Sequence, residues 1–336
     1  MTEAYFDNSA TTAPCCEAVK AVTEAMTQSW GNPSSLHAVG NRANALLESS
    51  RNDIASRLSC SPEEIFFTSG GTESNNLAVM GAAYQMRRMG RRIVSTSVEH
   101  SSIDDTLNRL EAEGFEVIKL RVDSYGRINE KELYAAVNSN TILITMMLVN
   151  NEIGTIMPVQ AAKRAAMMAR SPALIHCDAV QAFGKMPVKP ATLGVDLMTV
   201  SSHKIHGPKG VGALYIRKGV KIKPRTFGGE QEKKYAYANN DQGLDERALI
   251  ILSLLSLAFF GAFALYADGM EGAVCAPYLI FLLPGAPGQI RILGIHPGGF
   301  PGPCPLCPLS RIHGRNFNIR CFFFRFFKCS YIGCRN

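Results

Sequence analysis

The chain has 336 residues, of which 46% are hydrophobic and 19% charged, a composition typical of globular proteins with room for one large α/β domain and a smaller one. The formal net charge is +7, but residues 249–336 carry +5 of it, which leaves +2 for the rest. This distribution argues against a basic nucleic-acid surface, and we expect no nucleic-acid partner. The N-terminus lacks signal-peptide features, and the four scattered cysteines before residue 270 are typical of a reduced, cytoplasmic protein.

Short apolar runs alternate with longer amphipathic stretches between residues 64 and 216. Strands are predicted at 64–68, 92–96, 116–121, 141–149, 173–177, 195–200 and 212–216, and helices at 73–88, 102–113, 130–138 and 158–169. Strands that alternate with helices predict an α/β fold, here a mainly parallel seven-stranded sheet with helices on both faces.

This alternation stops after about residue 240, so we divide the chain into a domain at 1–240 and a tail at 241–336. Residues 248–267 form an uncharged run that is long enough to span a bilayer. Eight of the 17 prolines and 11 of the 17 phenylalanines follow residue 248. The tail therefore does not read as a continuation of the same domain.

Three interpretations of the tail stay open. A shift of reading frame explains the abrupt loss of pattern and is our first interpretation, with a frameshifted or disordered tail as its consequence. The second is a membrane anchor at 248–267, the one feature that would make a membrane a partner. The third is a small metal module built on Cys304 and Cys307. Because a second cysteine pair of suitable spacing is missing, we expect no metal site.

Five polar motifs each follow a predicted strand. They are residues 68–76, Glu99–His100, residues 150–154, Asp178 with Gln181, and residues 201–210. Each one alone is explained equally well by an ordinary turn or helix cap. Since open α/β sheets bind ligands at the carboxyl ends of their strands, the five motifs together predict one binding site.

The residue types in these motifs suit pyridoxal phosphate. Lys204, just after a strand, can form an imine with an aldehyde cofactor. Asp178 can pair with a protonated pyridine nitrogen. Gly70, Gly71 and Thr72 open a predicted helix, whose N–H groups can receive a phosphate. This loop matches neither the Walker sequence nor the dinucleotide fingerprint.

The same motifs, in this order, resemble those of the cysteine desulfurases, in the class V aminotransferase group of fold-type I pyridoxal-phosphate enzymes. The resemblance implies the large domain of the PLP-dependent transferase fold type I, with the small domain missing or replaced by the tail. It covers about residues 4–233 and is carried by residues 5–12, 32–37, 68–76, 99–100, 149–154, 176–181, 201–210 and 228–232.

The resemblance also implies roles for the matching residues. Lys204 would hold pyridoxal 5′-phosphate and later move protons at the substrate Cα, while His100 would stack on the pyridine ring and assist proton transfer. The other cofactor contacts would be Asp178 to the ring nitrogen, Gln181 to the ring hydroxyl, Asn151 to the ring oxygen and the substrate side, and Gly71, Thr72, Ser201 and His203 to the phosphate.

Cysteine desulfurases convert L-cysteine to L-alanine and pass the sulfur on, as a cysteine persulfide, for iron–sulfur cluster or thio-cofactor assembly. The resemblance therefore implies L-cysteine, a sulfur-acceptor or scaffold protein and a second copy of the chain as partners. Beyond residues 228–232 the family's Arg-x-Gly-Thr segment, nucleophilic-cysteine loop and carboxylate-binding arginine find no match. We therefore expect impaired turnover and a doubtful homodimer.

Other functions stay open beside this one. The first is a cofactor-binding fragment without catalytic activity. The second is a selenocysteine lyase or another class V transferase, which differs in its substrate. The third is a membrane or interaction protein that reuses the domain. Retained cofactor binding without turnover would favour the fragment, and solubility that depends on detergent would favour the membrane protein.

Overall fold

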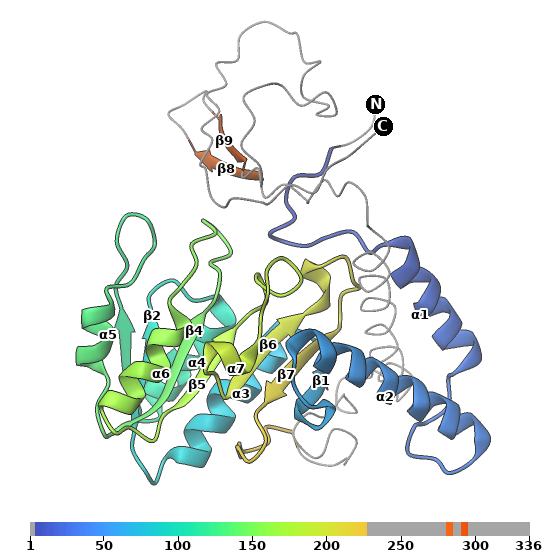
Figure 1. Ribbon diagram of the computed structural model, residues 1–336, viewed down its shortest axis with the longest axis horizontal. Coiled ribbons are helices and arrows are strands. Elements are labelled where there is room, and N and C mark those ends of the chain that lie inside the picture. The colour runs from blue at the N-terminus through green and yellow to red at the C-terminus, as the bar shows by residue number, and fades with distance from the viewer. Residues whose placement is uncertain (1–3, 227–279, 285–289, 295–336) are drawn as a thin grey trace, which may run out of the picture. The chain divides into compact units, whose positions relative to one another are not determined.

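The computed structural model describes residues 4–226, 280–284 and 290–294. A seven-stranded sheet with the strand order β1-β7-β6-β5-β4-β2-β3 forms the centre of the first range (Figure 1). Only β7 runs antiparallel to its neighbours, β1 and β6, and the remaining strand pairs are parallel. The predicted mainly parallel sheet is therefore confirmed. Its strands are β1 (Ile65–Thr68), β2 (Arg92–Thr96), β3 (Glu116–Leu120), β4 (Thr141–Met147), β5 (Leu174–Asp178), β6 (Leu197–Ser201) and β7 (Gly212–Ile216).

Helices cover both faces of this sheet. They are α1 (Cys16–Gln28), α2 (Ala38–Leu58), α3 (Gly71–Met86), α4 (Ser101–Ala112), α5 (Glu130–Ala136), α6 (Val159–Met168) and α7 (Pro190–Leu193). Side chains of α3 and α4 form one apolar cluster with the sheet, and side chains of α2, α5 and α6 form the other. Successive strand residues alternate between the clusters: Phe66 joins the first, and Ile65 and Phe67 join the second.

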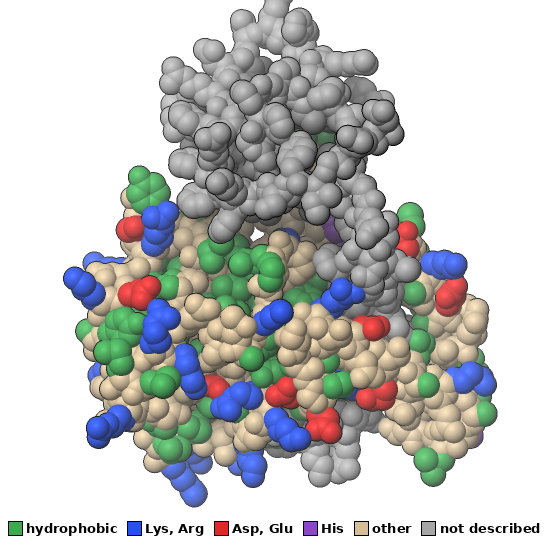
Figure 2. All heavy atoms as spheres, viewed as in Figure 1, with side chains coloured by type: hydrophobic (Ala, Val, Ile, Leu, Met, Phe, Trp, Pro, Cys, Tyr) green, Lys and Arg blue, Asp and Glu red, His purple; other side chains and the backbone are tan. Residues whose placement is uncertain are grey.

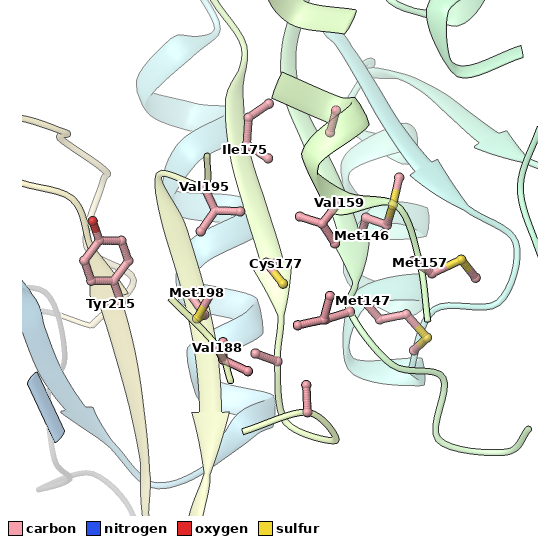
Figure 3. Packing of buried hydrophobic residues seen from close by; sticks show 14 of the residues in the cluster. Met146, Met147, Met157, Val159, Ile175, Cys177, Val188, Val195, Met198 and Tyr215 are labelled. Atoms are coloured by element: carbon pink, nitrogen blue, oxygen red, sulfur yellow. The ribbon is translucent and has the colours of Figure 1, made fainter. Parts of the chain in front are cut away.

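The middle of the sheet is buried on both sides. All seven residues of β4 are buried, and so is every residue of β6 and β7. Figure 3 shows the second cluster, in which Met146, Ile175 and Met198 project from neighbouring strands toward the same side. Double-sided burial explains why the sequence of β4 is a nearly continuous apolar run without alternation.

Every element predicted between residues 64 and 216 is present, with ends that differ by at most two residues. The sequence analysis missed α1 and α2. Helix α2 buries Ala43, Ile54 and Leu58 together with the polar residues Ser50 and Arg51, so its buried face is not a continuous apolar stripe in the sequence. Its ends carry recognisable signals, since the His37 side chain accepts the N–H of Gly40 and Ser59 takes a left-handed conformation.

Several predictions about the tail fall outside the described residues. These are the domain boundary at residue 240, the apolar run at 248–267 and the cysteines 304 and 307. Strands β8 (Ile280–Pro284) and β9 (Ile290–Gly294) form an antiparallel hairpin that the sequence analysis did not predict. Within the described part of the chain, no helix is both long and apolar enough to cross a membrane.

The charges of the described surface are mixed. On the face shown in Figure 2, lysine and arginine side chains are interspersed with aspartate and glutamate side chains. Some of them pair, as Arg92 does with Glu116 at 2.7 Å and Lys119 with Asp104 at 2.5 Å. Partly exposed pairs of this kind contribute little stability, and the mixture agrees with the small net charge of the first 248 residues.

The core position of Ile144 provides a test of this fold. Ile144 lies on β4 and is fully buried in the second cluster. We expect Ile144→Ala to lower the free energy of unfolding by about 2–5 kcal/mol, because it removes buried methyl groups and leaves a cavity. Urea unfolding measures this loss. The matched control is Ile156→Ala at a 60% exposed side chain, and an equal loss in both variants would contradict the assigned burial.

Candidate active site

Five polar motifs lie at one edge of the sheet. Strands β1, β2, β4, β5 and β6 all run in the same direction, so their carboxyl ends meet at this edge. Each of these strands is followed by one of the motifs predicted from sequence. The spatial arrangement of the motifs is thus as expected, while the role of each residue depends on its contacts.

Lys204 ends the short 3₁₀ helix η2 (Ser202–Lys204), directly after β6. Its Nζ donates hydrogen bonds to the carbonyl oxygens of Ser9 at 2.5 Å and of Ala10 at 2.9 Å. Burial lowers the pKa of Lys204, although Asp178, Asp7 and Glu152 act in the opposite direction. A larger fraction of its amine is therefore neutral than for an exposed lysine.

The N-terminal segment lies over the loop that contains Lys204. The Thr12 N–H donates to the carbonyl of His203 at 2.8 Å, and the Cys15 N–H donates to the carbonyl of His206 at 2.9 Å. The Thr12 hydroxyl accepts the His206 N–H at 2.6 Å. These bonds bracket Lys204 on both sides and fix its backbone against residues almost two hundred positions away.

Asp178 is the last residue of β5, with only 6% of its surface exposed. Its Oδ1 accepts the Val180 N–H at 2.9 Å and its Oδ2 accepts the Asn75 amide at 2.7 Å. Burial raises the pKa of Asp178, whereas these two bonds and the charges of His100 and Lys204 lower it. The carboxylate is thus held by fixed donors at the carboxyl edge of the sheet.

A glycine pair opens α3 beside β6. A Cβ at Gly70 would meet no atom within 4 Å, so space lies open there. At Gly71 a Cβ would lie 3.0 Å from Cγ2 of Val180 and 3.7 Å from Cβ of Ser201. The Ser201 hydroxyl is buried and has no hydrogen-bond partner among the described residues. Free N–H groups of a helix and an unused hydroxyl together suit an anion.

Glu99 connects the ends of β2 and β4. Its carboxylate accepts the Thr96 hydroxyl at 2.6 Å and the Met147 N–H at 3.0 Å. Burial, with the nearby charges of Asp178 and Asp104, raises the pKa of Glu99 to about 8, although the hydrogen bonds from Thr96 and Met147 lower it. Glu99 is thus largely protonated near neutral pH and serves as a structural link in this edge.

Comparison with known proteins identifies the family. The model of the aminotransferase class-V family matches residues 4–248. The chain belongs to the class-V aminotransferase family. The chain is 47% identical over 231 residues to the NifS/IcsS protein homolog of Lactobacillus delbrueckii subsp. bulgaricus, a match that covers 68% of this chain and 60% of the relative. It is 45% identical over 230 residues to cysteine desulfurase IscS of Methanosarcina thermophila, covering 68% and 56% of the two chains.

Solved structures of the family share this fold. A NifS-like protein superposes with a TM-score of 0.71 at 36% identity, covering 80% of this chain and 72% of that one. The structure of SspA in complex with cysteine gives a TM-score of 0.69 at 31% identity, covering 76% and 73%. The fold is therefore that of NifS-like, fold-type I pyridoxal-phosphate enzymes. The chain spans about 60% of the length of the curated relatives that it matches.

The other predicted site residues differ in their surroundings. Gln181 donates to the Ser9 carbonyl at 2.9 Å and accepts from Lys185 at 2.9 Å, so it lies next to Lys204. The His203 ring bonds to the Thr11 hydroxyl at 3.2 Å, and burial lowers the pKa of His203. Asn151 donates a hydrogen bond at 2.7 Å to Glu152, one of the carboxylates whose charge raises the pKa of Lys204.

Sequence analysis missed three contributors to the candidate site. The Ser9 and Ala10 carbonyls act through the backbone, for which no residue type gives a signal. Asn75 lies within the motif 68–76 that the sequence analysis singled out, four residues after Gly71. That spacing places both on one side of α3, which is the only sequence signal that Asn75 faces Asp178.

The raised pKa of Glu99 predicts a pH dependence of stability. Between pH 4.5, the ordinary pKa of a glutamate, and about 8, the folded chain holds a proton that the unfolded chain releases. The stability that Glu99 contributes to the folded chain is fully present below pH 4.5 and is lost as the pH rises to about 8. We expect Glu99→Gln, which cannot titrate, to gain stability relative to the wild type by up to about 1.4 kcal/mol per pH unit.

Urea unfolding at a series of pH values across this range measures the difference. Glu111→Gln on the exposed side of α4 is the matched control and should follow the wild type. A constant difference between Glu99→Gln and the wild type would contradict the burial of this carboxyl group.

Proposed function

We propose that residues 4–226 are the cofactor-binding part of a cysteine desulfurase-like enzyme that takes L-cysteine as its substrate. The observation that carries the proposal is the joint placement of Lys204 and Asp178. A lysine with a lowered pKa and a buried carboxylate lie within electrostatic range of each other at the carboxyl edge of the sheet. Members of this family are pyridoxal-phosphate enzymes, and these two groups are the ones that this cofactor requires.

The described residues fit the cofactor. The open space at Gly70, the N–H groups at the start of α3 and the unpartnered Ser201 hydroxyl suit its phosphate. Asp178 would pair with the ring nitrogen, and Gln181 would bond to the ring hydroxyl. Thr72 and His203 would complete the phosphate contacts, and Asn151 would contact the ring oxygen and the substrate side.

When bound, pyridoxal phosphate supplies an aldehyde for amines and a ring that withdraws electrons from the substrate. Lys204 has the larger neutral fraction that an amine needs to attack a carbonyl carbon or to accept a proton from the substrate Cα. The Ser9 and Ala10 carbonyls orient its Nζ. With the cofactor bound, Asp178 would keep a proton on the ring nitrogen, and His100 would assist proton transfer.

The comparisons support L-cysteine as the substrate, since the relatives include proteins named cysteine desulfurase and a structure in complex with cysteine. The sulfur acceptor within the chain is neither Cys60 nor Cys177. Burial raises the pKa of Cys60 to about 12 and that of Cys177 well above its ordinary value, so both stay thiols. We further propose a cytoplasmic location and transfer of the sulfur to an acceptor or scaffold protein.

The first prediction of this proposal concerns cofactor attachment. The purified chain with added pyridoxal phosphate is expected to show a visible absorbance band that Lys204→Ala abolishes. The control is Lys185→Ala, because burial and the charge of Lys204 lower the pKa of Lys185 to about 8 and make it a competing amine. A band that persists in Lys204→Ala and vanishes in Lys185→Ala would overturn the assignment of Lys204.

The second prediction concerns turnover. With L-cysteine and pyridoxal phosphate, the chain is expected to form alanine much more slowly than its longer relatives, because the nucleophilic-cysteine loop of the family finds no match in its sequence. Mass spectrometry of alanine and of persulfides on the chain measures both products. Rapid turnover would contradict the expected impairment. A cofactor band without any alanine would favour the alternative of an inactive cofactor-binding fragment.

A further inference from the structure

A continuous chain of hydrogen bonds joins Asp178 to His100. Asn75, with 1% of its surface exposed, donates from its Nδ2 to Oδ2 of Asp178 at 2.7 Å and to Oγ of Ser102 at 2.9 Å. Oγ of Ser102 lies 2.9 Å from Nδ1 of His100. Three elements take part, since Asp178 ends β5, Asn75 lies on α3 and Ser102 lies in the first turn of α4.

The carboxylate of Asp178 sets the direction of this chain. Both oxygens of Asp178 accept hydrogen bonds from N–H groups, Oδ1 from Val180 and Oδ2 from Asn75, so the amide group of Asn75 turns its nitrogen toward Asp178. Its two N–H groups are then both used, one by Asp178 and one by Ser102. Oδ1 of Asn75 is buried and without a hydrogen-bond partner among the described residues. Oδ1 of Asn75 thus stays unpaired, at a cost in free energy, because both N–H groups of the amide are directed at acceptors.

Ser102 passes this direction on to His100. Because Oγ of Ser102 accepts from Asn75, its single proton is free to point at Nδ1 of His100. The backbone N–H of Ser102 donates to the same nitrogen at 3.1 Å. Two donors aimed at Nδ1 require it to be the acceptor, so the proton of the neutral ring lies on Nε2.

We propose that Asn75 and Ser102 are positioning residues that couple the hydrogen-bond-accepting carboxylate of Asp178 to His100 and hold His100 as the Nε2–H tautomer. The inference rests on the proposed function for the use of the two terminal residues, whereas the hydrogen-bond chain and the tautomer stand without the cofactor. In the proposed enzyme, the ring-facing carboxylate and the ring-stacking histidine are thereby set by one network, and Nε2 presents a proton to the ligand.

The tautomer is measurable in the cofactor-free chain. Long-range ¹H–¹⁵N NMR of the full chain labelled at histidine distinguishes a protonated ring nitrogen from an unprotonated one, and His100→Gln assigns the signal. At a pH where the ring is neutral, we expect an unprotonated Nδ1 and a protonated Nε2. A wild-type ring protonated on Nδ1 would overturn the proposal, and this measurement needs no destabilised variant.

Variants then test the chain itself. Asn75→Ala does not touch His100, yet it is expected to raise the ratio of Nδ1–H to Nε2–H tautomer about fivefold, the effect of one ordinary hydrogen bond. Ser102→Ala should do the same, Ser102→Thr should restore the wild-type ratio, and Ser101→Ala should leave it unchanged. A wild-type ratio in Asn75→Ala would overturn the transmission from Asp178.

The loaded chain gives an independent readout. If Asn75 keeps Asp178 ready for the ring nitrogen, Asn75→Ala should weaken pyridoxal-phosphate binding about tenfold, because it removes a hydrogen bond to a charged group. Asn108→Ala on the exposed side of α4 is the control. Unchanged affinity would overturn the role of Asn75. A wild-type chain that does not bind the cofactor would contradict the proposed function, while the tautomer measurement would still decide this inference.

Discussion

The buried carboxylate of Asp178 is the constraint around which this edge of the sheet is organised. An ionised group that loses its water is stable only when fixed donors and opposite charges replace it. Here the donors come from the chain just after β5 and from α3, and the opposite charge comes from Lys204. The helix α3 must therefore approach β5 closely with Asn75 turned inward. Gly71 permits that approach, because a Cβ there would already press on Val180 at 3.0 Å.

The same closeness determines the proposed phosphate site. The first turn of α3 lies against Ser201 because Asn75, one turn later, is tied to Asp178. A single helix thus relates the carboxylate for the ring nitrogen to the donors for the phosphate. The N-terminal segment supplies the opposite side through its bonds to residues 203–206. Since these contacts join distant parts of the chain, the site forms only when the whole domain folds.

Most of the fold could be predicted from the sequence because the spacing of its apolar residues clearly distinguishes strands from helices. The buried strands of the sheet read as apolar runs, and the amphipathic helices between them are separated by clear turns. Helix α1 escaped prediction because its buried residues are the alanines Ala18 and Ala25, and α2 because its buried face mixes small and polar residues such as Gly40 and Arg51 with apolar ones. Burial of small side chains leaves little periodic signal in a sequence.

The candidate site likewise contains residues that could be predicted from the sequence and residues that could not. Lys204, Asp178 and Gly71 could be nominated because they follow strands, and the carboxyl edge of a parallel sheet gathers such residues. Asn75, Ser9 and Ala10 could not be nominated, because their roles depend on which atoms face each other after folding. Backbone carbonyls carry no residue preference, and an inward asparagine on a helix looks like an outward one until the helix is docked.

A row of polar side chains one step below Asp178 explains how the site residues stay aligned. His176 bonds through Nδ1 to Thr145 at 2.8 Å and through Nε2 to Thr199 at 3.1 Å, so it links β4, β5 and β6. Residues two apart share a face of the sheet, and the row therefore lies directly beneath Asp178 and Ser201.

This row of polar side chains fixes the register of β4, β5 and β6. A slip of one residue would move Asp178 to the opposite face of the sheet, where it would meet the second apolar cluster. A row of apolar side chains would tolerate such a slip better than His176, because each of its two ring nitrogens needs a hydrogen-bond partner. The arrangement also has a consequence at low pH. Burial lowers the pKa of His176 to about 3. The stability that neutral His176 contributes is therefore fully present above pH 6.5 and falls as the pH decreases toward 3. The contact that aligns the site is thus also one that acid weakens.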